Sequence, residues 1–124
     1  MSASIVLLAT DADHVHHEVD AVMGGDHQVV RVHAGADVLA AIREHDPVLV
    51  VLDLQIGNMG GMAACLDLRL EERAERIPPQ RIVMLLDRDA DEFLAKQAEA
   101  DAWIVKPIDA LLLRRTARDV LADA

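Results

Sequence analysis

The stretch VLVVLDLQIGNMGG, residues 48–61, joins an apolar run to a glycine-rich segment, and a single acid, Asp53, stands at the junction. A short apolar run without polar alternation is typical of a strand whose two faces are both buried. A carboxylate at the end of such a strand is costly unless it finds a charged or hydrogen-bonding partner. The stretch therefore predicts a parallel sheet that has a polar site where the strand over 48–52 ends.

Outward from this stretch, apolar or alternating runs predict four more strands, over 4–10, 27–33, 81–86 and 102–106. Helical spacing of apolar residues predicts five helices between and after them, over 11–24, 35–45, 62–76, 89–100 and 109–124. Strands that alternate with helices predict a parallel sheet with helices on both sides. Five such units are too few for an eight-fold barrel. We therefore expect an α/β, flavodoxin-like, doubly wound five-stranded parallel sheet in the order 2-1-3-4-5 with five helices.

Length and composition narrow the function further. The 124 residues suit a single domain over 1–124, and leave no room for an output domain. The apolar runs are too short to span a membrane and no secretory signal opens the chain, so we expect a cytoplasmic protein. A net charge of -10 argues against direct binding to nucleic acid or to a membrane surface. Cys65 is the only cysteine, which excludes an intramolecular disulfide and suggests a small helix-packing residue.

Three charged residues stand at or just past the carboxyl ends of predicted strands: Asp11, Asp53 and Lys106. The predicted strand order brings these ends to one edge of the sheet. Carboxylate oxygens suit Mg2+, and the backbone carbonyl of Gln55 is a candidate third ligand beside Asp11 and Asp53. A lysine ammonium can meet a carboxylate or a phosphoryl oxygen. A carboxylate in this company is a competent nucleophile toward a phosphoryl group, so Asp53 is the candidate phosphoacceptor.

The loop after Asp53 contains Gly57, Gly60 and Gly61. Glycine tolerates backbone conformations that other residues avoid, and it lets backbone approach a ligand closely. We therefore expect these glycines to bring the loop close to added phosphoryl oxygens.

These segments carry a family resemblance. LLATDAD (7–13), VLVVLDLQIGNMGG (48–61), IVMLL (82–86) and AWIVKP (102–107) resemble, in order and spacing, the receiver domains of two-component response regulators. The resemblance runs from about residue 4 to the end of the chain. It implies that Asp53 accepts a phosphoryl group from a histidine kinase, a phosphotransfer protein or a small phosphodonor. It also implies that Asp11 helps bind Mg2+, that Lys106 contacts the phosphoryl group, and that the Lys106-Pro107 bond is cis.

The chain departs from the family pattern in the loop after the first strand. Receivers usually have two adjacent acids there, whereas this chain has Thr10 and then Asp11. A threonine hydroxyl brings no charge, so we expect weaker Mg2+ binding unless Asp13, in the same loop, compensates. Gly57 stands where the family often has proline, which we expect to loosen the loop after Asp53.

A second departure concerns the switch positions. Receivers place Ser or Thr at the end of the fourth strand, whereas this chain has Leu86, followed by Asp87. Leucine cannot donate a hydrogen bond to a phosphoryl group, and Asp87 adds negative charge beside it. Trp103 takes the place of the family's switch aromatic. We therefore expect phosphorylation chemistry to be retained more readily than its usual coupling from hydroxyl to aromatic.

The histidines and several exposed apolar residues have simpler interpretations. The six histidines are scattered, which favours solvated surface, although His14 is expected to border the acidic pocket. Leu111 and Leu112, on the side of the last helix away from Leu113, suggest a partner surface together with Trp103; packing at the sheet edge is the alternative. We expect a monomer or a weak homodimer that uses this surface.

Three functions follow from these residues. The first is a stand-alone response regulator receiver in a phosphorelay, which accepts a phosphoryl group on Asp53 and signals to a downstream effector protein through protein-protein contacts. It is not an enzyme beyond Mg2+-dependent self-phosphorylation. The second is a phosphorylation-independent adaptor with a degenerate receiver site. The third, a flavodoxin-like enzyme or nucleotide binder, is disfavoured because the loop TDADH (10–14) has no glycines to cradle a phosphate.

Overall fold

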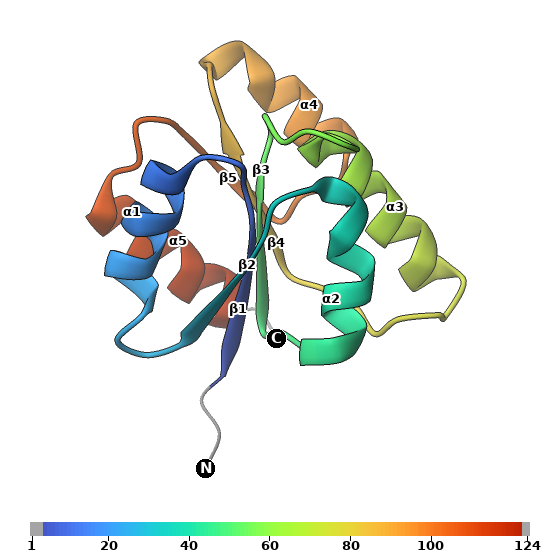
Figure 1. Ribbon diagram of the computed structural model, residues 1–124. Helices are drawn as coiled ribbons and strands as arrows, with labels where there is room; N and C mark the ends of the chain where they lie inside the picture. The colour runs from blue at the N-terminus through green and yellow to red at the C-terminus, as the bar shows by residue number, and fades with distance from the viewer. Residues whose placement is uncertain (1–3, 123–124) are drawn as a thin grey trace.

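A computed structural model describes residues 4–122 and shows a five-stranded parallel sheet between two layers of helices (Figure 1). The strands are β1 (Ile5–Ala9), β2 (Gln28–Val32), β3 (Leu49–Asp53), β4 (Ile82–Leu86) and β5 (Ala102–Val105). The helices are α1 (Asp13–Met23), α2 (Val38–His45), α3 (Gly61–Arg73), α4 (Glu92–Gln97) and α5 (Ala110–Ala122). All neighbouring strands are parallel, in the order β2-β1-β3-β4-β5. The predicted flavodoxin-like α/β topology is confirmed.

Two hydrophobic cores, one on each face of the sheet, explain the unbroken apolar runs. Helices α1 and α5 cover one face, and α2, α3 and α4 cover the other (Figure 1). Successive strand side chains point to opposite faces, so Val51 enters the α1/α5 core and Leu52 enters the other core. Every residue of β3 is buried, Asp53 included. A central strand covered on both faces has no exposed side on which polar residues would be favoured.

Several predicted helix boundaries are too wide. The predicted helices over 35–45 and 89–100 begin with short 3-10 turns, η1 (Gly35–Asp37) and η2 (Asp89–Asp91), which tighten the chain before each helix. The predicted helix over 62–76 ends at Arg73 because the chain turns there, with Glu75 at a left-handed φ of 60°. Residues 123 and 124 of the last predicted helix lie outside the described residues.

The carboxyl ends of the parallel strands meet at one edge, and this edge carries the polar residues. Strands β1 and β3 are neighbours, so Thr10, which follows β1, lies near Asp53, the last residue of β3. Strands β4 and β5 continue the sheet, and they bring Asp87 and Lys106 to the same edge. Within residues 4–122, none of the helices has the length and apolar character needed to span a bilayer.

Candidate functional site

Asp53 is the last residue of β3, and its side chain is only 2% exposed. Three donors satisfy this buried carboxylate. The Lys106 ammonium lies 2.6 Å from Oδ1, and the Gln55 backbone N–H donates to the same oxygen over 3.1 Å. The Thr10 hydroxyl donates to Oδ2 over 2.7 Å. A charge at this position is therefore tolerated because an opposite charge and two further hydrogen bonds accompany it.

Lys106 follows β5 and contacts two carboxylates. Its backbone N–H donates to the carbonyl of Leu86 over 2.8 Å, which fixes the start of the side chain beside the end of β4. Its ammonium lies 2.6 Å from Asp53 Oδ1 and 3.1 Å from Asp87 Oδ1. Burial alone would lower the pKa of Lys106, but the hydrogen bonds and charges of Asp53 and Asp87 outweigh burial and raise it. Lys106 is therefore a fixed positive charge, and the predicted cis Lys106-Pro107 bond is present.

The loop after β1 places its two acids differently. Asp11 is exposed, and its Oδ2 accepts a hydrogen bond over 3.0 Å from the backbone N–H of Gly57, across the site. Asp13 forms an ion pair with Arg31, with Nη1 2.7 Å from Oδ1. The hydrogen bond and the charge of Arg31 lower the pKa of Asp13. Asp13 is therefore paired with Arg31, and its compensation for Thr10 in Mg2+ binding stays a prediction.

In the loop after β3, glycine allows a close backbone approach and not a left-handed conformation. The left-handed backbone conformations in this loop belong to Asn58 (φ 52°) and Met59 (φ 76°), and no glycine among residues 4–122 has a positive φ. The glycines therefore do not use the left-handed conformations that glycine tolerates, and the approach of this loop to a phosphoryl group stays a prediction. Gly61 is needed for close approach instead, because a Cβ there would lie 2.4 Å from the carbonyl oxygen of Asp53.

The same loop is anchored by backbone contacts. The Gly57 N–H is held by Asp11, and the Ala36 N–H donates to the Asn58 carbonyl over 3.0 Å. Gly35 allows this contact, since a Cβ there would lie 1.7 Å from the carbonyl oxygen of Met59. The loop is thus tied to the loop after β1 at Gly57 and to η1 at Asn58, and the loosening expected at Gly57 stays a prediction.

The oxygen ligands of the site fit a lightly held divalent cation. Within residues 4–122, no group of three or more His, Cys, Asp or Glu side chains is arranged to hold a metal ion. The site offers two carboxylates, Asp11 and Asp53, and the backbone of Gln55 beside them. Mg2+ often binds proteins through one or two carboxylates, with waters and phosphate oxygens completing its shell. The residues present fit that mode and not an all-protein cage.

The two switch positions lie on neighbouring strands. Leu86 is completely buried and packs in the core under α2, α3 and α4. Trp103 is half-buried on β5, and its indole N–H donates over 2.8 Å to Glu92 at the start of α4. The Lys96 ammonium of α4 lies 5.8 Å from the centre of the indole ring. Trp103 is therefore a reporter of the position of α4.

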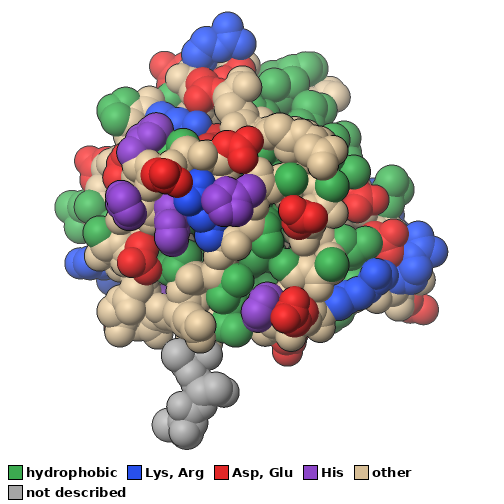
Figure 2. Space-filling model, in the orientation of Figure 1, with side chains coloured by type: hydrophobic (Ala, Val, Ile, Leu, Met, Phe, Trp, Pro, Cys, Tyr) green, Lys and Arg blue, Asp and Glu red, His purple; other side chains and the backbone are tan. Residues whose placement is uncertain are grey.

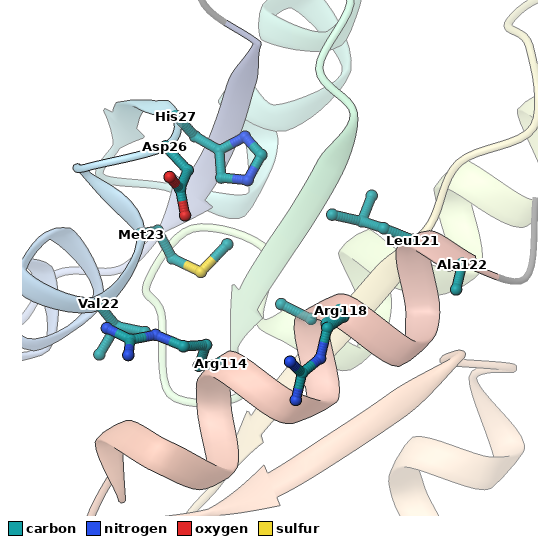
Figure 3. Close-up of a pocket in the computed structure, with 9 residues that line it drawn as sticks. Val22, Met23, Asp26, His27, Arg114, Arg118, Leu121 and Ala122 are labelled. Carbon is teal, nitrogen blue, oxygen red and sulfur yellow. The ribbon is translucent and has the colours of Figure 1, made fainter.

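The surface around the site agrees with the expectations for the histidines. None of the six is buried, and several gather on one face of the molecule (Figure 2). His14 lines a hollow of about 280 Å³ together with Lys106 and Pro107, so it does border the site. A separate cavity of about 440 Å³ lies between α1 and α5, where Arg114 and Arg118 border an apolar wall (Figure 3). It contains none of the predicted site residues.

Comparison with known proteins agrees with this geometry. The Response regulator receiver domain family matches residues 6–118. The chain belongs to that family. It is 30% identical over 96 residues to Protein PilH of Pseudomonas aeruginosa, covering 77% of this chain and 78% of PilH. It is 24% identical to the polar-differentiation response regulator DivK of Brucella ovis over the full length of both.

A solved structure extends the comparison to the fold. The receiver domain of sensor histidine kinase PA1611 from Pseudomonas aeruginosa superposes with a TM-score of 0.83 at 18% identity, covering 98% of this receiver and 99% of that chain. That structure has a magnesium ion coordinated in its active site cleft.

Sequence reasoning brought Asp53, Asp11 and Lys106 to one edge but missed two contacts among their neighbours. It considered Thr10 only as an uncharged residue that weakens Mg2+ binding, whereas its hydroxyl donates to Asp53. It placed Asp87 near the phosphoryl position without a partner, whereas Asp87 contacts Lys106. The sequence could have indicated both contacts, because Thr10 and Asp87 directly follow strands that end at the site.

Proposed function

We propose that this receiver accepts a phosphoryl group on Asp53 and passes the signal on through protein contacts. The observation that carries the proposal is the buried Asp53 carboxylate 2.6 Å from the Lys106 ammonium, at the carboxyl edge of the sheet. A buried charge pair is weak evidence for stability, since burial of two charges consumes most of their attraction. A role in phosphoryl chemistry explains why this pair is present.

The transfer uses groups that the chain already positions. A carboxylate oxygen of Asp53 forms a bond to phosphorus, while the phosphorus–nitrogen bond of a phosphohistidine or the phosphorus–oxygen bond of an acyl phosphate breaks. The donor keeps that electron pair. Thr10 and the Gln55 N–H orient the carboxylate, and Lys106 offers positive charge to the phosphoryl oxygens. Mg2+, when bound by Asp11, Asp53 and the Gln55 carbonyl, supplies the further charge that phosphoryl transfer requires.

The partners follow from this chemistry. A histidine kinase or phosphotransfer protein is the donor, and a downstream effector protein reads the result. The effector surface is formed by Trp103 on β5 with Leu111 and Leu112 on α5, which are 62% and 42% exposed. Large apolar side chains at such exposure are common in protein interfaces.

A second candidate function is a phosphorylation-independent adaptor. Leu86 favours it, because this buried side chain cannot hydrogen-bond a phosphoryl group. In that case Asp53, Thr10 and Lys106 form a satisfied polar cluster that only stabilises the fold.

Incubation with acetyl phosphate and Mg2+, followed by intact mass, separates the two functions. We expect an added mass of one phosphoryl group in the wild type and none in Asp53→Asn. The matched control is Asp46→Asn, which removes one acid at the C-terminus of α2, where the left-handed φ of 48° suits asparagine. The adaptor interpretation holds if the wild type gains no mass, or gains it equally in Asp53→Asn.

A further inference from the structure

Two carboxylates compete for one ammonium at the site. Lys106 Nζ lies 2.6 Å from Asp53 and 3.1 Å from Asp87, and its side chain is only 20% exposed. The Asp53 contact is explained by the burial of that residue. The Asp87 contact needs another reason, because the Asp87 side chain is 33% exposed and has a route to water.

The second oxygen of Asp87 makes the position more unusual. Oδ2 is buried and has no hydrogen-bond partner within residues 4–122. A buried, unpaired carboxylate oxygen is destabilising, and such groups are few in native structures. Asp87 therefore keeps one oxygen on Lys106 while the other stays unsatisfied.

The turn that follows Asp87 is closed by hydrogen bonds between its first and last residues. The Arg88 N–H donates to Asp91 over 3.0 Å, and the Arg88 guanidinium donates to the same carboxylate over 3.1 Å. This closed turn leads directly into α4, whose first residue, Glu92, accepts the hydrogen bond from Trp103. Leu86 on the other side is fixed in the core and bonded to the Lys106 N–H. A displacement at Asp87 is therefore transmitted toward α4 and not into β4.

We propose that Asp87 is an anionic gate on Lys106, which holds the ammonium before phosphorylation and leaves it afterwards. This inference rests on the proposed phosphorylation of Asp53. A phosphoryl group carries roughly two negative charges where the carboxylate carried one, so its repulsion of Asp87 is stronger. Lys106 then pairs with the phosphoryl oxygens, and Asp87 turns to water, which satisfies its buried oxygen. Only hydrogen bonds and ion pairs are exchanged in this step.

The gate gives the chain a way to respond without a hydroxyl at position 86. A switch needs different contacts in its two states. In this chain, the difference is that Asp87 is repelled out of the site. In a receiver with Ser or Thr at this strand end, the hydroxyl would instead be drawn toward the phosphoryl group. The buried leucine is then compatible with switching, because Asp87 is the group that moves.

Asp87→Asn tests the gate, with Asp89→Asn as the matched control. Both variants remove one acid from the same loop, but Asp89 is exposed and only Asp87 contacts Lys106. With acetyl phosphate and Mg2+, we expect Asp87→Asn to gain the Asp53 adduct faster, on the order of tenfold. We also expect it to lose most of the Trp103 fluorescence change, because no charge is expelled. Asp89→Asn should match the wild type in both measurements.

A second measurement needs no phosphodonor. The sequence has two lysines, Lys96 and Lys106, so lysine-selective 15N labelling gives two ammonium signals, one of them an internal reference. We expect Asp87→Asn to shift the Lys106 signal and Asp89→Asn to leave it unchanged. An unchanged Lys106 signal in Asp87→Asn overturns the gate whatever the adduct does.

The outcomes separate the gate from the proposed function. An adduct that forms in the wild type, with the rate and the Trp103 response unaltered by Asp87→Asn, overturns the gate alone. An adduct that forms only in Asp87→Asn overturns the gate, because Asp87 then blocks the site of the wild type and does not leave Lys106. No adduct in either protein overturns the phosphoacceptor role and the gate together.

Discussion

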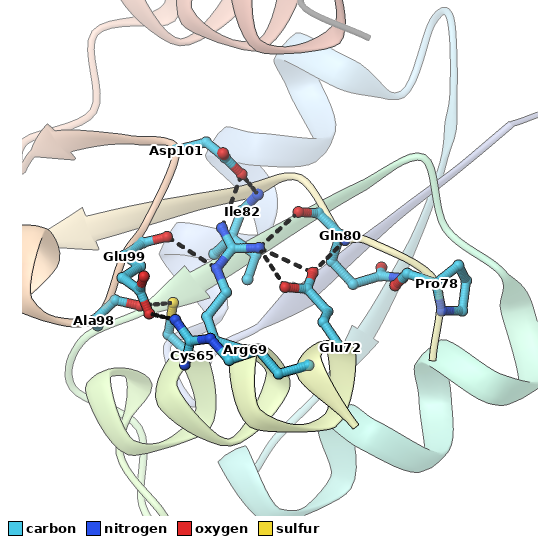
Figure 4. Close-up of polar contacts among 10 residues, drawn as sticks. Cys65, Arg69, Glu72, Pro78, Gln80, Ile82, Ala98, Glu99 and Asp101 are labelled. Carbon is cyan, nitrogen blue, oxygen red and sulfur yellow. Dashed lines mark hydrogen bonds and ion pairs between the residues drawn. The ribbon is translucent and has the colours of Figure 1, made fainter. Parts of the chain in front are cut away.

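Two polar clusters lie at opposite ends of the strands, and they differ in how completely their hydrogen-bonding groups are paired. At the amino ends of β4 and β5, Arg69 of α3 is enclosed by acceptors (Figure 4). It donates to the carbonyls of Glu99 and Gln80, each over 2.9 Å, and to the carboxylates of Glu72 and Asp101. At the carboxyl ends of the strands, Lys106 is shared between two carboxylates.

The difference lies in how completely each cluster is satisfied. Asp101 accepts from the Ile82 N–H over 2.7 Å as well as from Arg69, so it joins β4 to α3. Within residues 4–122, Asp87 at the site has a buried unpaired oxygen, and none of the side chains around Arg69 does. A complete network stabilises one arrangement, whereas an incomplete one leaves a place for another ligand. The complete Arg69 network is therefore the one expected to stabilise the fold, and the Lys106 cluster is the one proposed above to take part in phosphoryl chemistry.

Arg69→Met tests whether the Arg69 cluster stabilises the fold, and it should have the largest effect on stability. Removal of the guanidinium leaves Glu72, Asp101 and two carbonyls without their donor, and such losses are large in a buried network. We expect the free energy of unfolding to fall by about 3 kcal/mol in urea titration. Arg73→Met, on the same helix, is the control: Arg73 is 58% exposed and pairs with Glu99, so about 0.5 kcal/mol or less should be lost. Equal losses of unfolding free energy in the two variants would contradict a structural role for Arg69.

Cys65 lies beside the Arg69 cluster (Figure 4). Its thiol is fully buried and donates to the Ala98 carbonyl over 3.2 Å, and burial raises its pKa to about 11. Because the thiolate is the reactive form, the raised pKa alone lowers its fraction at pH 8 by about a hundredfold, equivalent to about 2.8 kcal/mol. We expect iodoacetamide to label Cys65 at least that much more slowly in the native protein than in urea. Rapid native labelling would show that this edge opens readily.

The two clusters also differ in how much of them the sequence predicted. Strand ends in a parallel sheet are fixed by the pattern, so Asp53, Asp11 and Lys106 were brought together correctly. The Arg69 cluster was not predicted, because its partners come from α3, the turn before β4 and the turn before β5, and no periodicity relates them. At the site, too, the sequence pattern does not show which side chains pair or which residues take left-handed conformations. Asp13, the first residue of α1, pairs with Arg31 on β2, and Asn58 and Met59 take the left-handed conformations in the loop after β3.

Leu86→Thr tests whether the site edge tolerates the family's usual hydroxyl. The leucine is fully buried, so its replacement loses apolar contacts and introduces a hydroxyl without a partner. We expect the free energy of unfolding to fall by about 2 kcal/mol. Beryllofluoride with Mg2+ should recover part of this loss, because a phosphoryl mimic gives the hydroxyl an acceptor. Leu111→Thr, on an exposed position of α5, should cost about 0.5 kcal/mol or less and gain from beryllofluoride no more stability than the wild type gains.

Among the variants inside the two clusters, Asp53→Asn should change the stability least. It separates a functional role of Asp53 from a structural one. The variant removes a buried charge, but Lys106 keeps Asp87, and the amide still accepts a hydrogen bond. Groups placed for function often contribute little to stability. We therefore expect the free energy of unfolding to stay within about 1 kcal/mol of the wild type.

Asp101→Asn is the matched change in the Arg69 cluster. Its carboxylate accepts from Arg69 and from the Ile82 N–H, so the neutral amide weakens two charge-assisted hydrogen bonds at once. It should lose more stability than Asp53→Asn by urea titration, although Asp101 is far more exposed than Asp53. The reverse order would mean that the buried Asp53–Lys106 pair holds the fold together, and a stability role would then explain the aspartate at the end of β3.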